Sequence, residues 1–407
     1  MVSPVTRLVA GRSLSALATA IIPTTLTLAV LRSSGGDAEL GLVLACELVP
    51  MLVFLPVGGV VADRFRPARV VLAADLGRAA AQAALGAELL LGGARLPVIA
   101  ALAALTGLAV AFGTPAVAPL VAAAVEGPRR LRVNARIGVA TGLSAVMAPA
   151  IAGGVVLAAG PGWACLLTAA VFACSAATLG GVRTAPRAGA GRTGLGRGLA
   201  EGWGEVRRRP WFLASVLGHG VWHFTAGLFL TLGPLIAVRR LGGEGAWVLI
   251  VQCGSAGLLA GVLVAPRLPV RRPLVPIAAG AAAFCLPLAA LAVPVPAPAL
   301  AAAYFAAMFG LGLLTPLWET LIAARVPEAA LGRVRSFDSL ISFAARPLGF
   351  AVAAPLAGWA GATAPLAISA VAVAAASLAV LAVPGAVADT TPPAPVPARA
   401  PVGESTL

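Results

Sequence analysis

The chain has no lysine, although its 407 residues include 29 basic side chains, all of them arginine. A nucleotide-binding P-loop places a lysine against the phosphates. Schiff-base catalysis uses a lysine amine as its nucleophile. The missing lysine therefore excludes both kinds of chemistry for this chain.

Charged residues are also scarce, at 11% of the chain, whereas hydrophobic residues make up 60%. Soluble proteins average about 25% charged and about 45 to 50% apolar residues. This composition predicts an integral membrane protein that lies in a lipid bilayer. The first apolar run reaches about Leu31, which is longer than the core of a signal peptide, so we expect a retained helix.

Metal-ligating side chains are few and scattered. The five cysteines occur singly in apolar runs, without the spacing of a metal site or of a paired framework. They are Cys46, Cys165, Cys174, Cys253 and Cys285. We therefore expect these cysteines to behave as small hydrophobic side chains, and we expect no metal and no cofactor.

A spanning helix needs about 20 mostly apolar residues, and the sequence contains twelve such segments. They cover residues 8–31, 39–62, 68–92, 96–125, 135–159, 163–183, 211–238, 244–265, 274–293, 299–324, 336–357 and 363–383. The predicted fold class is therefore an all-α membrane protein with twelve transmembrane helices.

The net charge of +14 would suggest nucleic acid in a soluble chain. Here the arginines instead gather in the amino terminus and in the loops after even-numbered spans. The opposite loops hold only Arg32, Arg95, Arg239 and Arg240. By the positive-inside rule, both termini are predicted to be cytoplasmic, in a multi-pass protein of the plasma membrane, with no nucleic-acid partner.

The sequence repeats itself at an interval of about 200 residues. Thr114-Pro115 recurs as Thr315-Pro316, and Arg132-Val133 recurs as Arg333-Val334. This repeat predicts two six-helix bundles, residues 1–183 and 211–383. The Gly- and Arg-rich segment 184–210 is predicted to be a cytoplasmic linker, and the Pro/Ala-rich tail 384–407 is predicted to be disordered.

A short charged turn separates the second and third spans and carries the first family signal. It reads Gly58-Gly59-Val60-Val61-Ala62-Asp63-Arg64-Phe65-Arg66-Pro67-Ala68-Arg69. The pattern Gly-x-x-x-Asp-Arg with further arginines resembles the loop between helices two and three of major facilitator superfamily transporters. The resemblance implies that Gly59, Asp63, Arg64 and Arg69 form part of a cytoplasmic gate.

Further motifs narrow the resemblance to one branch of this superfamily. Helices four and five of drug:proton antiporters are similar to the segments 111–116 and 148–154. Helices ten and eleven of siderophore (enterobactin-type) and macrolide exporters are similar to the segments 317–320, 332–338 and 347–349. The resemblance implies two pseudo-symmetric bundles around a substrate site, with helices one, four, seven and ten lining the cavity. It also implies a monomer that exports a drug, siderophore or secondary metabolite, with protons as the second partner.

Ionisable residues inside the spans are functional candidates by default, usually with a partner. Asp75 and Arg78 stand three residues apart on one helix face and are expected to neutralise each other. Glu47 and Arg346 are predicted to pair, because counting residues along their helices places both near the same depth.

His219 and His223 lie four residues apart on the seventh span and face the same way. Glu319 lies on the tenth span, which the resemblance places at the cavity. A carboxylate there can bind and release a proton as its surroundings change. We therefore expect Glu319 to be the proton-coupling group, assisted by His219 and His223; the alternative is that they only line the cavity or support the helices.

The sequence leaves several functions open besides proton-coupled export. An uptake symporter of the same fold would have the same features. A membrane enzyme is less well supported, because the sequence shows no nucleophile motif and no cluster with metal spacing; we expect no enzyme. A membrane scaffold without transport activity is a further alternative. Transport itself would draw on an ion gradient, a partner ATPase or the substrate gradient.

Overall fold

The computed structural model describes residues 3–33, 37–93, 95–125, 127–179, 203–268, 271–384 and 386. Within these residues, twelve helical segments are long and apolar enough to cross a membrane, which confirms the predicted spans. The same residues form helices and turns, with no strand, as an all-α fold requires. Most of the predicted linker and nearly all of the predicted tail lie outside the described residues.

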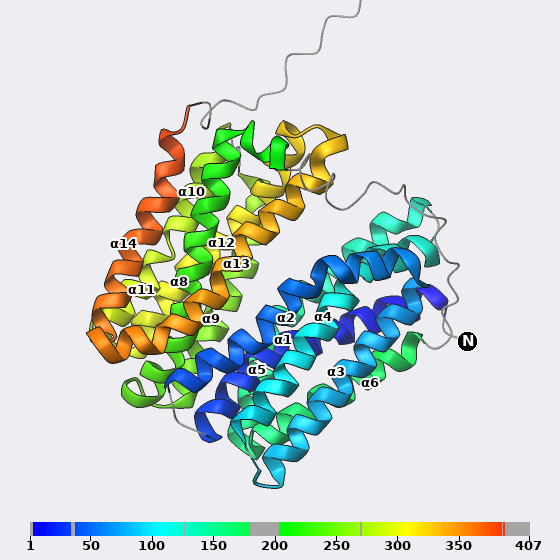
Figure 1. Ribbon diagram of the computed structural model, residues 1–407, viewed down its shortest axis with the longest axis horizontal. Helices are drawn as coiled ribbons and strands as arrows, with labels where there is room; N and C mark the ends of the chain where they lie inside the picture. The colour runs from blue at the N-terminus through cyan, green and yellow to red at the C-terminus, as the bar shows by residue number, and fades with distance from the viewer. Residues whose placement is uncertain are drawn as a thin grey trace, which may run out of the picture.

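The amino-terminal helices pack together as one group, which runs from blue through cyan to blue-green in Figure 1. They are α1 (Pro4–Ser33), α2 (Asp37–Arg64), α3 (Pro67–Leu90), α4 (Leu96–Ala124), α5 (Gly127–Ala159) and α6 (Pro161–Leu179). We call this group the N-terminal bundle. Within it, α2 packs along α4, and α3 packs against both α4 and α6.

The second group, green to red in Figure 1, is the C-terminal bundle. It contains α8 (Pro210–Arg240), α9 (Glu244–Val264), α10 (Leu274–Ala282), α11 (Cys285–Ala292), α12 (Ala297–Arg325), α13 (Glu328–Ala360) and α14 (Thr363–Ala379). Two 3₁₀ turns, η1 (Ala265–Arg267) and η2 (Val380–Ala382), extend α9 and α14. The chief packing pairs are α9 with α12 and α8 with α13.

Two helices, α5 and α13, begin eight residues earlier than the sequence predicted. The α5 helix starts at Gly127 and α13 starts at Glu328, whereas the expected spans began at residues 135 and 336. The extra turns are polar, and a hydropathy criterion cannot detect helix that continues beyond the apolar layer. Residues near the start of an expected span therefore lie well inside a helix.

The ninth predicted span is divided into α10 and α11 by a turn at Ala283 and Phe284. Pro287 explains the position of this break, since its ring collides with the carbonyl group four residues earlier and it has no N–H to donate. The backbone tightens there: the Phe284 N–H bonds the Ala281 oxygen at 3.2 Å. The break lies beside Ala281, which lines the cavity described below.

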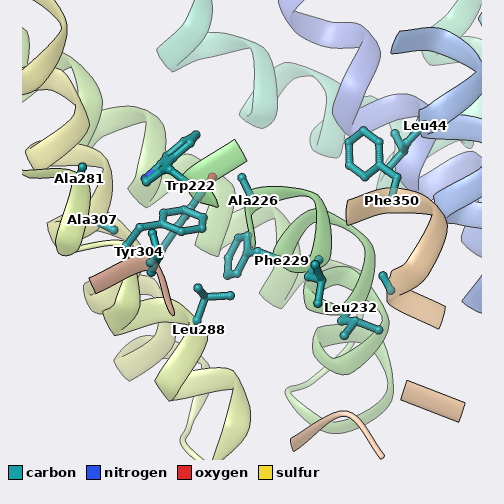
Figure 2. Packing of buried hydrophobic residues seen from close by; sticks show 14 of the residues in the cluster. Leu44, Trp222, Ala226, Phe229, Leu232, Ala281, Leu288, Tyr304, Ala307 and Phe350 are labelled. Carbon is teal, nitrogen blue, oxygen red and sulfur yellow. The ribbon is translucent and has the colours of Figure 1, made fainter. Parts of the chain in front are cut away.

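The two bundles contact each other through α2 with α13 and α5 with α9. We call the end of the helices with the α1–α2 and α8–α9 connections the arginine-poor end, and the opposite end the arginine-rich end. Near the arginine-poor end, a Cβ added to Gly41 would collide with the carbonyl oxygen of Phe350. One hydrophobic cluster continues there from the C-terminal bundle to Leu44, which lies beside Phe350 in Figure 2.

Candidate functional site

A cavity of about 340 Å³ lies in the C-terminal bundle. The residues that line it come from α8, α10, α12 and α13. They are His219, Trp222, His223, Ala281, Leu311, Leu314, Thr315, Trp318, Glu319, Asp338, Ser339, Ser342, Phe343 and Arg346. The three predicted proton-coupling residues and Arg346 thus share one cavity.

Asp338 is the centre of a polar group within this cavity. The Trp318 indole N–H donates to one carboxylate oxygen at 2.8 Å, and the Ser342 hydroxyl donates to the other at 3.3 Å. The Nδ1 atom of His219 lies 3.8 Å from the carboxylate, too far for a hydrogen bond. The edge of the His219 ring meets Trp318 with the centroids 4.9 Å apart. Asp338 is therefore held by neutral donors, with an imidazole close by.

His223 and Arg346 form a second polar group, with 2.6 Å between His223 Nδ1 and Arg346 Nη2. A guanidinium can only donate. The Nδ1 atom must therefore accept, which leaves the imidazole neutral with its proton on Nε2. Phe343 packs against His223, with ring centroids 4.2 Å apart, and also against the guanidinium.

Glu319 forms an ion pair with Arg335 of α13. About half of each side chain is exposed, so water reaches this carboxylate. The sequence placed Glu319 at the cavity, and the structure does so too. Arg335 was not foreseen as its partner.

The structure does not form the predicted ion pair between Glu47 and Arg346. Arg346 is turned toward α8, where His223 accepts its hydrogen bond. Glu47 lies on α2, with its backbone oxygen close to Gly107 of α4. Counting residues gives the height of Glu47 and Arg346 along their helices. It does not give the direction in which each side chain points around the helix axis.

The predicted gate is only partly described. Arg64 and Arg69 are exposed at the arginine-rich end, while the side chain of Asp63 lies outside the described part of the chain. A Cβ on Gly58 would collide with the Ala111 backbone oxygen of α4, whereas Gly59 has open space around it. Gly58 is therefore the glycine that permits close helix packing, and the gate role of Asp63 stays a prediction.

Asp75 and Arg78 form an ion pair inside the N-terminal bundle. Arg12 of α1 binds the second carboxylate oxygen of Asp75, and Ser175 donates to the same oxygen at 2.8 Å. Asp75 is fully buried. This group holds two arginines and one acid. Arg12 lies inside the first predicted span, but its pairing with Asp75 was not predicted.

Sequence reasoning missed Asp338 as a site residue. The signal was present, because Asp338, Ser342 and Arg346 follow one another at intervals of four residues and so share a helix face. The expected span, 336–357, already contained Asp338, but only two residues from its start. The helix begins at Glu328, so Asp338 lies well inside it.

Comparison with known proteins identifies the family to which the chain belongs. The model of the Major Facilitator Superfamily matches residues 8–349. This chain belongs to the major facilitator superfamily. It is 26% identical over 354 residues to the multidrug efflux pump Tap of Mycobacterium tuberculosis, with 82% of each chain covered. It is also 28% identical over 264 residues to the uncharacterized transporter y4rN of Sinorhizobium fredii, with 63% of this chain and 65% of that protein covered.

Solved structures of this superfamily share the fold. The nucleoside transporter NupG (D323A mutant) superimposes with a TM-score of 0.75 at 13% identity, covering 93% of this chain and 99% of that one. A D-xylose–proton symporter superimposes with a TM-score of 0.70 at 14% identity, covering 95% and 99%. At such identities the likeness shows the fold alone, which is the two-bundle architecture that the repeat predicted.

These findings make the chain a multi-pass membrane transporter of small molecules. The family and the matched relatives are transporters, which confirms the expectation that the chain is not an enzyme. Members of this family carry small-molecule substrates, often together with protons.

Proposed function

We propose that this transporter exports a hydrophobic or amphipathic small molecule, such as a drug, siderophore or secondary metabolite, in exchange for protons. The observation that carries the proposal is the cavity, because it combines ionisable residues with the rings of Trp222, Trp318 and Phe343. Aromatic and apolar walls with a few placed polar groups are typical of small-molecule sites. The relative Tap, described as a multidrug efflux pump, supports the same direction of transport.

Two groups in the cavity are suited to bind the counter-transported proton. Glu319 is exposed and lies in an ion pair, so a proton from water reaches it and competes with Arg335. His223 offers Nδ1 to Arg346, so a proton binds that atom only after Arg346 has moved away, because two cations would otherwise lie side by side. Either event changes the charge of the cavity, which is what coupling requires.

The arrangement of the bundles fits one state of an alternating-access cycle. Interbundle contacts near the arginine-poor end include Gly41 with Phe350 and Arg32 with Glu244. With the arginine-rich end in the cytoplasm of a plasma-membrane protein, this state is closed toward the outside. We assign Asp63, with Arg64 and Arg69, to the gate that closes the cytoplasmic side in the opposite state.

Inverted membrane vesicles test the direction and the coupling ion together. Vesicles containing the transporter are acidified inside by respiration and supplied with ethidium, Nile red or dansylglycine, which are cationic, neutral and anionic dyes. Antiport predicts that at least one dye accumulates inside, and that a protonophore abolishes the accumulation. Accumulation only under the reverse gradient would indicate a symporter. No dye accumulating beyond transporter-free vesicles would contradict the proposal.

A further inference from the structure

Two hydrogen-bond donors in the cavity lack acceptors within the described part of the chain. The Trp222 indole Nε1 and the Arg346 Nε are both buried, and neither has a hydrogen-bond partner there. Trp222 as a whole is only 7% exposed. A buried donor without an acceptor costs free energy, so this pair calls for an explanation.

The two donors belong to the same part of the cavity. The guanidinium of Arg346 lies 6.0 Å from the Trp222 ring centroid, and both residues line the cavity. His223 lies beside both of them, because its ring centroid is 5.1 Å from that of Trp222. A single acceptor group in this part of the cavity would thus lie near both the guanidinium and the indole, and a small turn of these side chains would bring their free N–H groups to it.

The positive charge of Arg346 is also unbalanced by its described neighbours. Its hydrogen-bond acceptor is the neutral imidazole of His223. The acids of the cavity are engaged elsewhere: Glu319 with Arg335, and Asp338 with Trp318 and Ser342. Asp338 lies eight residues before Arg346 on α13, about 12 Å along the helix axis. The cavity is therefore acidic toward the arginine-rich end, where Asp338 lies, and cationic farther inside, where Arg346 lies.

We infer that this cationic part is the binding site for the anionic group of the substrate, so that the transported class is a lipophilic anion with an aromatic body. Arg346 donates to the anion from its free Nε and from Nη atoms, since guanidinium groups bind carboxylates through paired N–H groups. The Trp222 N–H supplies a further donor. The rings of Phe343, Trp222 and Trp318 contact the apolar body.

The inference rests on the proposed function, because it names the substrate class of the same cavity. It is tested by binding rather than by transport, so the two can fail separately. The purified full-length transporter in lipid nanodiscs is titrated with dansylglycine, whose carboxylate is ionised, and with dansylglycinamide, which has nearly the same shape without the charge. Binding is followed by the rise in dansyl fluorescence on direct excitation.

The wild-type protein is expected to bind the anion at least about tenfold more tightly than the amide. Arg346→Gln removes the preference, and Arg346→Lys keeps part of it, because the charge remains without the planar fork. Trp222→Phe weakens the preference to a smaller extent, since only one neutral donor is lost. Arg267→Gln is the matched control: it removes an exposed arginine of η1, and the preference stays as in the wild type.

Several outcomes would overturn the inference: equal affinity for the two probes, no binding of the anion, or a preference that survives in Arg346→Gln. Gel filtration and thermal melting show whether each variant is folded. If Arg346→Gln is not folded, the reduced preference of Arg346→Lys shows whether Arg346 binds the anion. Proton-driven dye accumulation that persists without any anion preference would refute only the substrate class. An anion preference without proton-driven export would refute only the proposed function.

Discussion

Arg32 of α1 and Glu244 of α9 join the two bundles through a two-point ion pair. The Arg32 Nε donates to one oxygen of Glu244 at 2.7 Å, and Nη2 donates to the other at 2.6 Å. Parallel N–H donors to one carboxylate give this pair a defined geometry. It lies at the arginine-poor end, where the bundles also meet through Gly41 and Phe350.

Removing this pair should shift the transporter toward the opposite arrangement. Because both side chains are partly exposed, we expect a loss of only about 0.2 to 1 kcal/mol of closing free energy for Glu244→Gln or Arg32→Gln. The distribution of distances between nitroxides at Leu91 and Trp359, in a cysteine-free background, reports this shift. The exchange Arg32→Glu with Glu244→Arg should restore the wild-type distribution. Single variants that match the wild type would show that the pair does not hold this end closed.

Asp75 is expected to be the most sensitive acid of the N-terminal bundle. Asp75→Asn would leave Arg12 and Arg78 buried without a counter-ion, at a cost of about 3 to 5 kcal/mol. The unfolding midpoint of the purified protein measures this loss. Arg78→Gln should cost less, because Arg12 still pairs with Asp75.

Glu88→Gln provides the control for Asp75→Asn on the same helix. Glu88 pairs with the exposed side chain of Arg95 at 3.0 Å, and an exposed pair contributes little to stability. Its unfolding midpoint should stay close to that of the wild type. If Asp75→Asn melted at the same temperature as Glu88→Gln, the buried group would have no structural importance.

Glu319→Gln should abolish uphill, proton-driven transport while downhill exchange continues. The amide keeps the shape of the side chain and removes its titration, so the cavity can no longer exchange a proton at this position. Transport in proteoliposomes with and without a pH gradient separates the two activities.

Asp338→Asn tests the neighbouring acid under the same conditions. An amide oxygen can still accept from the Trp318 N–H, so the packing is preserved. We expect this variant to retain uphill transport. If Asp338→Asn uncouples transport and Glu319→Gln does not, Asp338 is the coupling acid and the assignment of Glu319 is wrong.

Glu47 and Arg346 remain candidates for a pair in the opposite arrangement of the bundles. Their helices, α2 and α13, are in contact. In the arrangement that the structure shows, however, Arg346 binds His223. Glu47→Arg and Arg346→Glu should each reduce the share of molecules in the opposite arrangement, measured with the same nitroxides. The double exchange should recover that share. A double variant no better than either single one would refute the pairing.

The membrane-spanning helices could be predicted from the sequence, because length and hydropathy decide which segments cross a membrane. The sequence also located Glu319, His219, His223 and Arg346, since each is an ionisable residue in an apolar run. It did not reveal their partners. Residue spacing gives the height of a side chain along its helix, whereas a partner such as His223 for Arg346 also depends on how the helices are rotated.

The contacts of Arg12 and Asp338 were also missed, although both residues lie inside predicted spans. Each stands near the start of its span, whereas α1 begins at Pro4 and α13 begins at Glu328, so both lie at least two turns inside their helices. The break beside Pro287 was visible as a proline in an apolar run, yet a hydropathy window does not register the lost hydrogen bond.

Gly41 lies so close to the Phe350 backbone that a methyl group added there would destabilise only one of the two arrangements of the bundles. Alanine at position 41 would be compressed while the arginine-poor end is closed, and the strain would disappear when α2 and α13 separate there. Every 1.4 kcal/mol of such strain changes the ratio of the two arrangements about tenfold. Glycine at this position thus keeps the transporter from being held with its arginine-poor end open.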